Sequence, residues 1–422
     1  MHKKNKDTFL EGNGANIMKK NFLKVFVLMM LTFLICGCFE EEKVVTSDMK
    51  GGKISEDKTE IDSDNAEKKV EEKSSTKKDS VTSSKRQTSD MIEKILDSME
   101  LEEKIGQMVM IGIQGTELNN DIIYSLNNFH FGGVIFYDRN LESVAQTRKL
   151  VADIEQSANQ KVPMFFAIDE EGGLISRGVN FLEAAPSQEE IGLSGDVEAA
   201  KDVAIHNATI LRNIGVNLNF APVADVGSKD TRSFGDDAQL VTKFVEAAAQ
   251  GYESENFLYT LKHFPGIGKS KIDPHQEVSN IEDSREILET EDLPPFKKII
   301  SGHDNSKFMV MIGHLKYDAL DPENSASLSH AVITNLLRNK LGFDGVVITD
   351  DLEMGAIKNN VDLSAIGVKM ILAGGDIALV CHNYESQQIV YNSILDAVKR
   401  GEISEERINE SVRRILKMKM NL

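Results

Sequence analysis

The sequence predicts a (β/α)₈ barrel of parallel strands and helices, and three observations support that prediction. Eight short apolar runs recur between residues 108 and 380, most of them separated by stretches with helical periodicity. Short strands that alternate with helices form right-handed βα units, and eight such units close into a barrel. Polar residues follow five of these runs, and a barrel places all such strand ends on one face. An open doubly wound sheet is the alternative, but no glycine-rich phosphate motif follows the first run.

Residues 1–38 have the layout of a secretion signal. Met18, the expected translation start, is followed by two lysines, a short apolar centre and Ile35-Cys36-Gly37-Cys38. The centre is shorter than the about 20 residues that a membrane span needs, and this layout is typical of a cleaved signal. The last four residues resemble a bacterial lipobox, so we expect Cys38 to carry a lipid that anchors the protein on the outer side of the cell membrane. An uncleaved N-terminal anchor is the alternative.

Residues 39–88 are predicted to form a disordered linker. They are mostly Lys, Glu, Asp, Ser and Thr, and such a segment cannot bury enough apolar surface to offset the entropy of ordering. A flexible segment of this length has an r.m.s. reach of roughly 40 Å, which would let an anchored domain work within the cell wall. The barrel is expected at residues 89–422.

The barrel elements can be placed in order. Apolar residues at helical spacing between 91 and 99 predict a first helix, and the periodicity at 144–158 and 199–214 predicts two of the helices between strands. The eight predicted strands are 108–113, 133–137, 162–168, 216–226, 257–261, 308–312, 345–348 and 377–380.

Composition narrows the possible partners. The formal net charge of −19 argues against a nucleic-acid backbone as partner, because such proteins usually present a basic face. The three cysteines form no CxxC pattern and there is no HExxH, so we expect no metal and no cofactor. Cys381 ends an apolar run and is expected to be a plain buried residue.

The polar strand ends supply the candidate chemistry. In order they are Asp169, Asp225, Lys262-His263, His314 and Asp350-Asp351. A carboxylate that leaves an apolar strand, such as Asp350, is partly desolvated and can act as metal ligand, base or nucleophile. A metal would need further ligands, for which Asp225 or His314 could serve, but no spacing motif supports one. We assign Asp350 to chemistry and Asp351 to capping or orientation.

Two further groups of residues are candidates. Asp273 and His275 are separated only by Pro274, and an Asp that hydrogen-bonds an imidazole fixes its tautomer and leaves the other nitrogen to move a proton. An exposed loop pair without a role is the alternative, and the preceding Gly266-Ile267-Gly268 indicates mobility. The charged or imidazole side chains suited to hold a polyhydroxylated ligand are Asp169, Arg232, Lys262 and His263, although each could instead form a surface ion pair.

These motifs resemble glycoside hydrolase family 3, and most closely its single-barrel β-N-acetylhexosaminidases. In sequence order they are Ile168-Asp169-Glu170-Glu171-Gly172-Gly173, Asn219-Phe220-Ala221-Pro222-Val223-Ala224-Asp225, Arg232-Ser233-Phe234-Gly235, Lys262-His263-Phe264-Pro265-Gly266, Asp273-Pro274-His275 and Thr349-Asp350-Asp351-Leu352. The resemblance, over residues 89–422, implies retaining hydrolysis of terminal β-linked N-acetylglucosamine. It makes Asp350 the nucleophile and His275 the acid/base, oriented by Asp273. Sugar hydroxyls would be bound by Asp169, Arg232, Lys262 and His263.

The sequence departs from the family pattern at Ile267, Leu174 and Pro274, where His, Arg and Ser or Thr are common. None of these removes an expected catalytic group. We therefore expect a secreted, lipid-anchored β-N-acetylglucosaminidase that acts on cell-wall muropeptides. Two alternatives stay open: a glycosidase or phosphorylase of the same barrel with another sugar preference, and a carbohydrate-binding lipoprotein without turnover.

Overall fold

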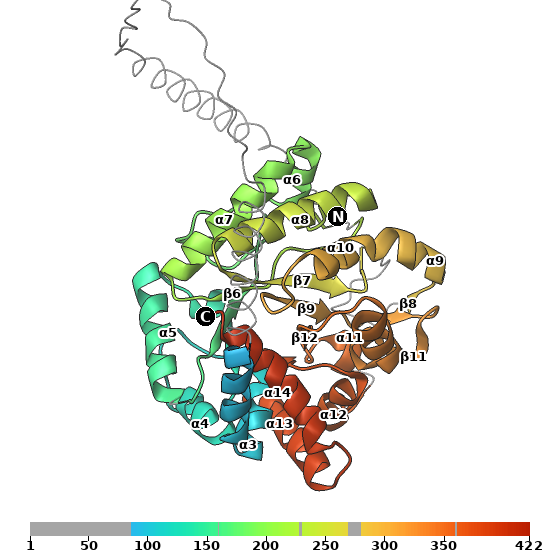
Figure 1. Cartoon of the computed structure of the whole chain (residues 1–422). Helices are drawn as coiled ribbons and strands as arrows, with labels where there is room; N and C mark the ends of the chain where they lie inside the picture. Colours follow the sequence, from blue (N-terminus) through green and yellow to red (C-terminus); the bar gives the residue numbers. More distant parts are fainter. Residues whose placement is uncertain (1–85, 159, 228–229, 269–279, 359–360) are drawn as a thin grey trace, which may run out of the picture. The chain divides into compact units, whose positions relative to one another are not determined.

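Eight parallel strands follow one another around a barrel in chain order (Figure 1). The computed structural model describes residues 86–158, 160–227, 230–268, 280–358 and 361–422. The strands are β1 (Val109–Gly112), β2 (Gly133–Phe136), β3 (Phe165–Ile168), β6 (Leu218–Asn219), β7 (Leu258–Phe264), β9 (Phe308–Ile312), β12 (Val346–Thr349) and β13 (Ala378–Val380). Each pairs with the next in parallel and β13 pairs with β1, while a bridge between Ile348 and Ile377 joins β12 to β13. The predicted barrel is confirmed, and each strand overlaps its predicted run, with β7 continuing three residues past its run, to Phe264.

Helices cover the outside of the barrel between successive strands (Figure 1). They are α4 (Asn120–Phe129), α5 (Val144–Ala158), α7 (Val197–Asn213), α8 (Ala238–Ser254), α10 (Pro294–Gly302), η4 (Ala331–Lys340), α12 (Leu363–Ala373) and α13 (Tyr384–Lys399), with α3 (Leu101–Gln107) before β1 and α14 (Glu405–Lys419) after α13. Polar side chains begin several of them: Asn119, Asp237 and Ser404 accept backbone N–H groups of the first turn. The strands read as continuous apolar runs because both of their faces are buried.

Shorter elements lie in the connections that follow the strands. After β2 and β3 these are η1 (Asp138–Asn140), β4 (Glu170–Gly172), β5 (Ile175–Ser176) and α6 (Gln188–Ser194). After β7 they are β8 (Asn280–Ile281), α9 (Arg285–Ile287) and η2 (Leu288–Asp292), and after β9 they are β10 (Lys316–Tyr317), β11 (Asp321–Ser325) and η3 (Ala326–Leu328). The helix α11 (Gly355–Lys358) follows β12. Barrel enzymes carry their chemistry in connections at this end of the strands.

A lysine is buried beneath the opposite end of the barrel. Lys419 of α14 is 2% exposed, and its Nζ donates to Oε1 of Gln107 at 2.7 Å and to the carbonyl of Gly132 at 2.8 Å. The same nitrogen lies 4.8 Å from the centre of the Phe165 ring. Burial lowers the pKa of Lys419 to about 7, because the charged form loses its hydration there.

Of the N-terminal part for which the sequence made predictions, the structure describes only the last residues, from 86 on. The backbone is helical over 86–97, so the first helix reaches three residues ahead of the predicted boundary at 89. The predicted signal, Cys38 and the rest of the linker lie outside the described residues. None of the helices that the structure describes is both long and apolar enough to cross a membrane. Cys381 is fully buried, as expected.

Candidate active site

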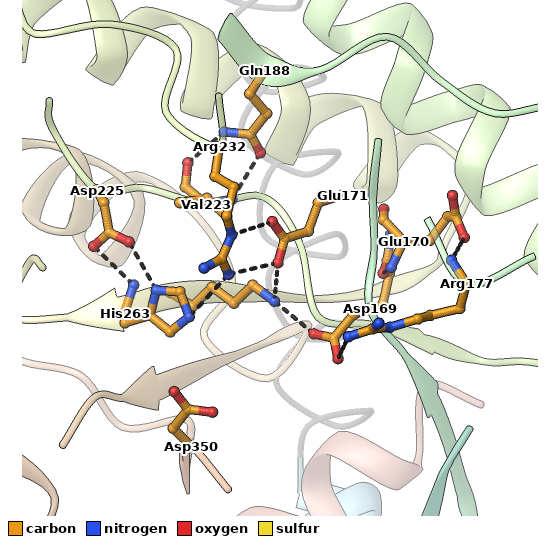
Figure 2. Close-up of polar contacts among 12 residues, drawn as sticks. Asp169, Glu170, Glu171, Arg177, Gln188, Val223, Asp225, Arg232, His263 and Asp350 are labelled. Atoms are coloured by element: carbon orange, nitrogen blue, oxygen red, sulfur yellow. Dashed lines mark hydrogen bonds and ion pairs between the residues drawn. The ribbon is translucent and has the colours of Figure 1, made fainter. Parts of the chain in front are cut away.

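A cavity of about 410 Å³ opens at the carboxyl ends of the strands. Its walls include Asp169, Arg232, Lys262, His263 and Asp350, which are the substrate-binding residues and the nucleophile expected from the sequence. Asp169 and Asp350 directly follow β3 and β12, Lys262 and His263 lie in the last residues of β7, and Arg232 comes from the connection after β6, so the barrel brings strand ends from distant parts of the chain to one place. Figure 2 shows the side chains of Asp169, Arg232, His263 and Asp350 around this place.

Lys262 lies between two carboxylates. Its Nζ is 2.7 Å from Oδ1 of Asp169 and 2.5 Å from Oε1 of Glu171. Arg232 binds the same glutamate with two nitrogens, Nε at 2.8 Å and an Nη at 2.9 Å (Figure 2). Burial acts to raise the pKa of Glu171, but Lys262 and Arg232 outweigh it and lower this pKa to about 2. The four side chains therefore form one charged network with fixed geometry on the cavity wall.

His263 is held by Asp225 on the other side of this network. Nδ1 of His263 lies 2.8 Å from Oδ2 of Asp225, and the backbone N–H groups of His263 and Ile267 donate to Oδ1 at 3.1 Å and 2.9 Å. An Nη of Arg232 approaches Nε2 at 3.4 Å. Because a guanidinium only donates, Nε2 accepts and the ring proton stands on Nδ1, facing the carboxylate. Asp225 thus orients an imidazole, whereas the sequence had offered it as a possible metal ligand.

Lys262 and His263 are neighbours in the chain, yet both line the cavity. In a regular strand adjacent side chains point to opposite faces. Here the pairing of β7 with β9 shifts register between Leu261 and Phe264. The carbonyl of Lys262 accepts the N–H of Ala224 at 2.7 Å, which ties this end of β7 to the segment that leads to Asp225.

Asp350 follows β12 and is half-buried in the cavity wall. Its Oδ1 accepts the backbone N–H of Asp351 at 2.8 Å. Burial acts to raise its pKa, but the hydrogen bond from the Asp351 N–H and the nearby Lys262 ammonium group help to hold it below the ordinary value. Asp350 is therefore ionised near neutral pH, as a nucleophile must be.

Asp351 has the orienting role that the sequence left open. Its carboxylate accepts the N–H groups of Glu353 and Cys381 at 3.1 Å and 3.2 Å and lies 3.2 Å from Nε2 of His382. It is not the N-cap of a long helix, since α11 begins only at Gly355 and ends at Lys358. These bonds fasten the turn after β12 to the turn after β13.

Asp273, Pro274 and His275 lie outside the described residues, so their roles stay predictions. The other two departures from the family pattern can be placed. Ile267 is half-buried and lines the cavity. Leu174 lies between β4 and β5, is 79% exposed, and is not among the described residues that line the cavity.

Sequence reasoning assigned no role to several charged residues of the cavity wall: Glu171, Arg177, Glu353 and His382. Arg177 comes from the short β4–β5 hairpin and approaches Oδ2 of Asp169 at 3.8 Å and the centre of the Tyr137 ring at 5.2 Å. The double glutamate before Gly172-Gly173 was visible in the sequence, but nothing there indicated that Glu171 would pair with Lys262 and Arg232.

No group of three His, Cys, Asp or Glu side chains within the described ranges could hold a metal ion. The two ligands that the sequence offered beside Asp350 are engaged elsewhere. Asp225 binds His263, and both ring nitrogens of His314 are hydrogen bonded within the protein.

Comparisons with known proteins relate the chain to one family. A family model described as the glycosyl hydrolase family 3 N-terminal domain matches residues 100–418. A β-hexosaminidase of Xylella fastidiosa is 35% identical over 286 residues, which are 65% of this chain and 83% of that protein. β-Hexosaminidase A of Pseudoalteromonas piscicida is 30% identical over 339 residues, 73% of this chain but only 56% of that protein.

Solved structures with a similar fold belong to the same family. A glycoside hydrolase family 3 β-N-acetylglucosaminidase from Paenibacillus sp. str. FPU-7 is 38% identical with a TM-score of 0.74, and the match covers 77% of this chain and 63% of that one. A glycosyl hydrolase of the same family from Mycobacterium smegmatis is 29% identical with a TM-score of 0.70, covering 76% of this chain and 98% of that one. The chain thus spans less than two thirds of the Pseudoalteromonas and Paenibacillus proteins.

Proposed function

Because the chain belongs to glycoside hydrolase family 3, we propose that it is a retaining exo-β-N-acetylglucosaminidase. The observation that carries the proposal is an ionised carboxylate, Asp350, beside a rigid charged network in a cavity large enough for a sugar. The Xylella and Paenibacillus relatives, named a β-hexosaminidase and a β-N-acetylglucosaminidase, support the sugar.

The network suits a sugar whose hydroxyls need both donors and acceptors. Lys262 and Arg232 supply charged donors, and Asp169 supplies a charged acceptor that is only 15% exposed. Hydrogen bonds with one charged partner are stronger than neutral ones. Because these groups already hold one another, they lose little side-chain entropy when the sugar binds.

In the proposed reaction Asp350 attacks the anomeric carbon and forms a glycosyl-enzyme intermediate, which water then hydrolyses. Retaining glycosidases usually take the acid from a second carboxyl group with a raised pKa. Glu171 cannot serve, since its pKa is about 2. Asp169 is paired with Lys262, and Glu353 accepts the backbone N–H groups of His382 and Asn383. This favours an acid from outside the described wall, and His275, oriented by Asp273, is the residue that the family resemblance assigns.

The first experiment measures the reaction itself. The purified protein should hydrolyse p-nitrophenyl β-N-acetylglucosaminide in preference to the β-glucoside, and NMR of the early product should show the β-anomer. A 5-fluoro N-acetylglucosaminyl fluoride should label Asp350, identified by mass spectrometry. Labelling of another residue, or an α-anomer as first product, would contradict the mechanism. A rate that depends on added phosphate would favour a phosphorylase, and sugar binding without turnover would favour a binding protein.

We also propose that the natural substrates are peptidoglycan-derived muropeptides, reached from a lipid anchor on the outer side of the cell membrane. The support is the lipobox-like Ile35-Cys36-Gly37-Cys38 and the charged segment 39–88 in the sequence. Purified muropeptides with a terminal N-acetylglucosamine should release that sugar, detected by chromatography. No release from muropeptides, with chitobiose cleaved readily, would point to chitin fragments instead.

A further inference from the structure

His314 is buried behind the cavity and hydrogen bonded through both ring nitrogens. It lies two residues after β9 and is 1% exposed. Nε2 is 3.0 Å from the carbonyl oxygen of Asp351, and Nδ1 is 2.8 Å from Oγ of Ser327. A carbonyl oxygen only accepts, so Nε2 carries the proton. Burial lowers the pKa of His314 more than the nearby Asp350 raises it, so the ring is neutral and the Ser327 hydroxyl donates to Nδ1.

The bond to Asp351 completes a set of contacts that holds this residue on three sides. His314 fixes the carbonyl, and the carboxylate is fixed by the N–H groups of Cys381 and Glu353 and by His382. Because the carbonyl and the side chain of Asp351 are both held, the orientation of its backbone N–H is fixed. It points at Oδ1 of Asp350, 2.8 Å away.

The two carboxylate oxygens of Asp350 are therefore not equivalent. Oδ1 accepts the Asp351 N–H, whereas Oδ2 accepts no hydrogen bond from any residue that the structure describes. The backbone of Asp350 is also held, because its N–H donates to the carbonyl of Ile312 at 3.0 Å. Ile312 ends β9 and His314 follows it, so one strand end fixes the backbone on both sides of this carboxylate.

We propose that His314 is a positioning residue, which acts through Asp351 to occupy Oδ1 of Asp350 and leave Oδ2 as the attacking oxygen. This inference rests on the proposed function. In the first step Oδ2 forms the bond to the anomeric carbon, while the electron pair of the breaking glycosidic bond stays with the leaving oxygen, which takes a proton from the general acid. Water later gives a proton to the same residue, which now acts as a base, and forms its bond to the same carbon, while Oδ2 leaves with the electron pair. The Asp351 N–H stabilises the returning carboxylate charge.

The test separates positioning from binding. His314→Leu should lower the maximal rate of labelling of Asp350 by the 5-fluoro N-acetylglucosaminyl fluoride on the order of 100-fold, because small errors in nucleophile placement are that costly. Inhibition by N-acetylglucosamine should stay within about twofold of wild type, since the hydroxyl-binding network is untouched. His314→Gln, whose amide can still donate to the Asp351 carbonyl, should recover most of the labelling rate. Ser327→Ala, which frees Nδ1, should give an intermediate loss.

His303 offers a matched control in the connection between α10 and β9. It precedes β9, binds Glu253 through Nδ1 at 2.9 Å with 8% of its side chain exposed, and does not line the cavity among the described residues. His303→Gln should leave the labelling rate unchanged. If His314→Leu does not fold, His314→Gln and Ser327→Ala are compared with His303→Gln in the same assay. A wild-type labelling rate in Ser327→Ala or in a folded His314→Leu, or weaker N-acetylglucosamine binding in proportion to the lost rate, would overturn the positioning role. A wild-type protein that is not labelled would instead overturn the proposed function, and the inference with it.

Discussion

Replacing Glu171 with Gln tests the electrostatic account of the cavity with one change of similar shape. Glu171 is 4% exposed and is the carboxylate that Lys262 and Arg232 share. In Glu171→Gln both cations stay in place, but only the half-buried Asp169 is left to Lys262. Removing one partner of a buried ion pair costs about 3–5 kcal/mol, because the remaining charge is still buried.

The pKa of Glu171 gives a second estimate of how much its ionised form stabilises the fold. It falls from the ordinary 4.5 to about 2 on folding, and each unit corresponds to about 1.4 kcal/mol, so the ionised form contributes roughly 3 kcal/mol to the free energy of unfolding. Since the folded-state pKa lies below the unfolded-state pKa, this contribution is complete above pH 4.5 and is lost as the pH falls toward 2. At pH 3 roughly half of it remains.

Urea denaturation at pH 7 and pH 3 measures both the loss of unfolding free energy and its dependence on pH. Glu171→Gln should be about 3 kcal/mol less stable than wild type at pH 7, and the difference should shrink at pH 3. Glu198→Gln is the control. Glu198 is 75% exposed and its carboxylate lies 3.7 Å from Nζ of Lys201, and exposed ion pairs of this kind contribute little to the free energy of unfolding. A Glu171→Gln protein as stable as wild type at pH 7, or a difference that does not change with pH, would refute the reasoning.

The remaining predictions concern residues in and away from the cavity. Asp350→Ala should abolish turnover by removing the nucleophile; wild-type rates would show that the nucleophile lies elsewhere. His275→Ala should slow hydrolysis more for substrates with poor leaving groups than for activated aryl glycosides, since only the former need a proton, and equal losses would remove the acid role. Between about pH 7 and 10.5 Lys419 is protonated in the unfolded state but mostly neutral in the folded state, so the free energy of unfolding rises with pH. From pH 7 to pH 9 it should rise by about 2 to 3 kcal/mol more in wild type than in Lys419→Met, as measured by urea denaturation. Parallel pH profiles of the two proteins would contradict the lowered pKa. Cys38→Ser should release the protein from membrane fractions; unchanged retention would favour an uncleaved anchor.

Much of the barrel could be predicted because its signal is local. Strands buried on both faces are continuous apolar runs, and all eight runs contain or lead directly into a strand. The barrel closes between β12 and β13 through one bridge and a few backbone hydrogen bonds, among them the N–H of Ile377 to the carbonyl of Val347 at 3.0 Å. Backbone bonds of this kind leave no motif in the sequence. Once eight βα units are counted, closure follows from the common right-handed connection.

The candidate site was only partly predictable. Residues at or directly after strand ends, such as Asp169, Lys262 and Asp350, were found because a barrel collects strand ends on one face. Glu171 and Arg177 belong to the β4–β5 hairpin, whose three- and two-residue strands are too short to show a pattern. The register shift in β7 that turns both Lys262 and His263 to the cavity likewise depends on pairing with β9 and has no local signature.

The sequence by itself determined the alternation of strands and helices, the side chains at the strand ends and the family motifs, because all of these are carried by neighbouring residues. Only the tertiary structure decided the partners of those side chains. Arg232 and Glu171 are 61 residues apart, and His314 and Asp351 are 37 apart. Which charge meets which, which imidazole nitrogen carries the proton and which oxygen of Asp350 accepts the Asp351 N–H depend on distances that exist only after the barrel has closed.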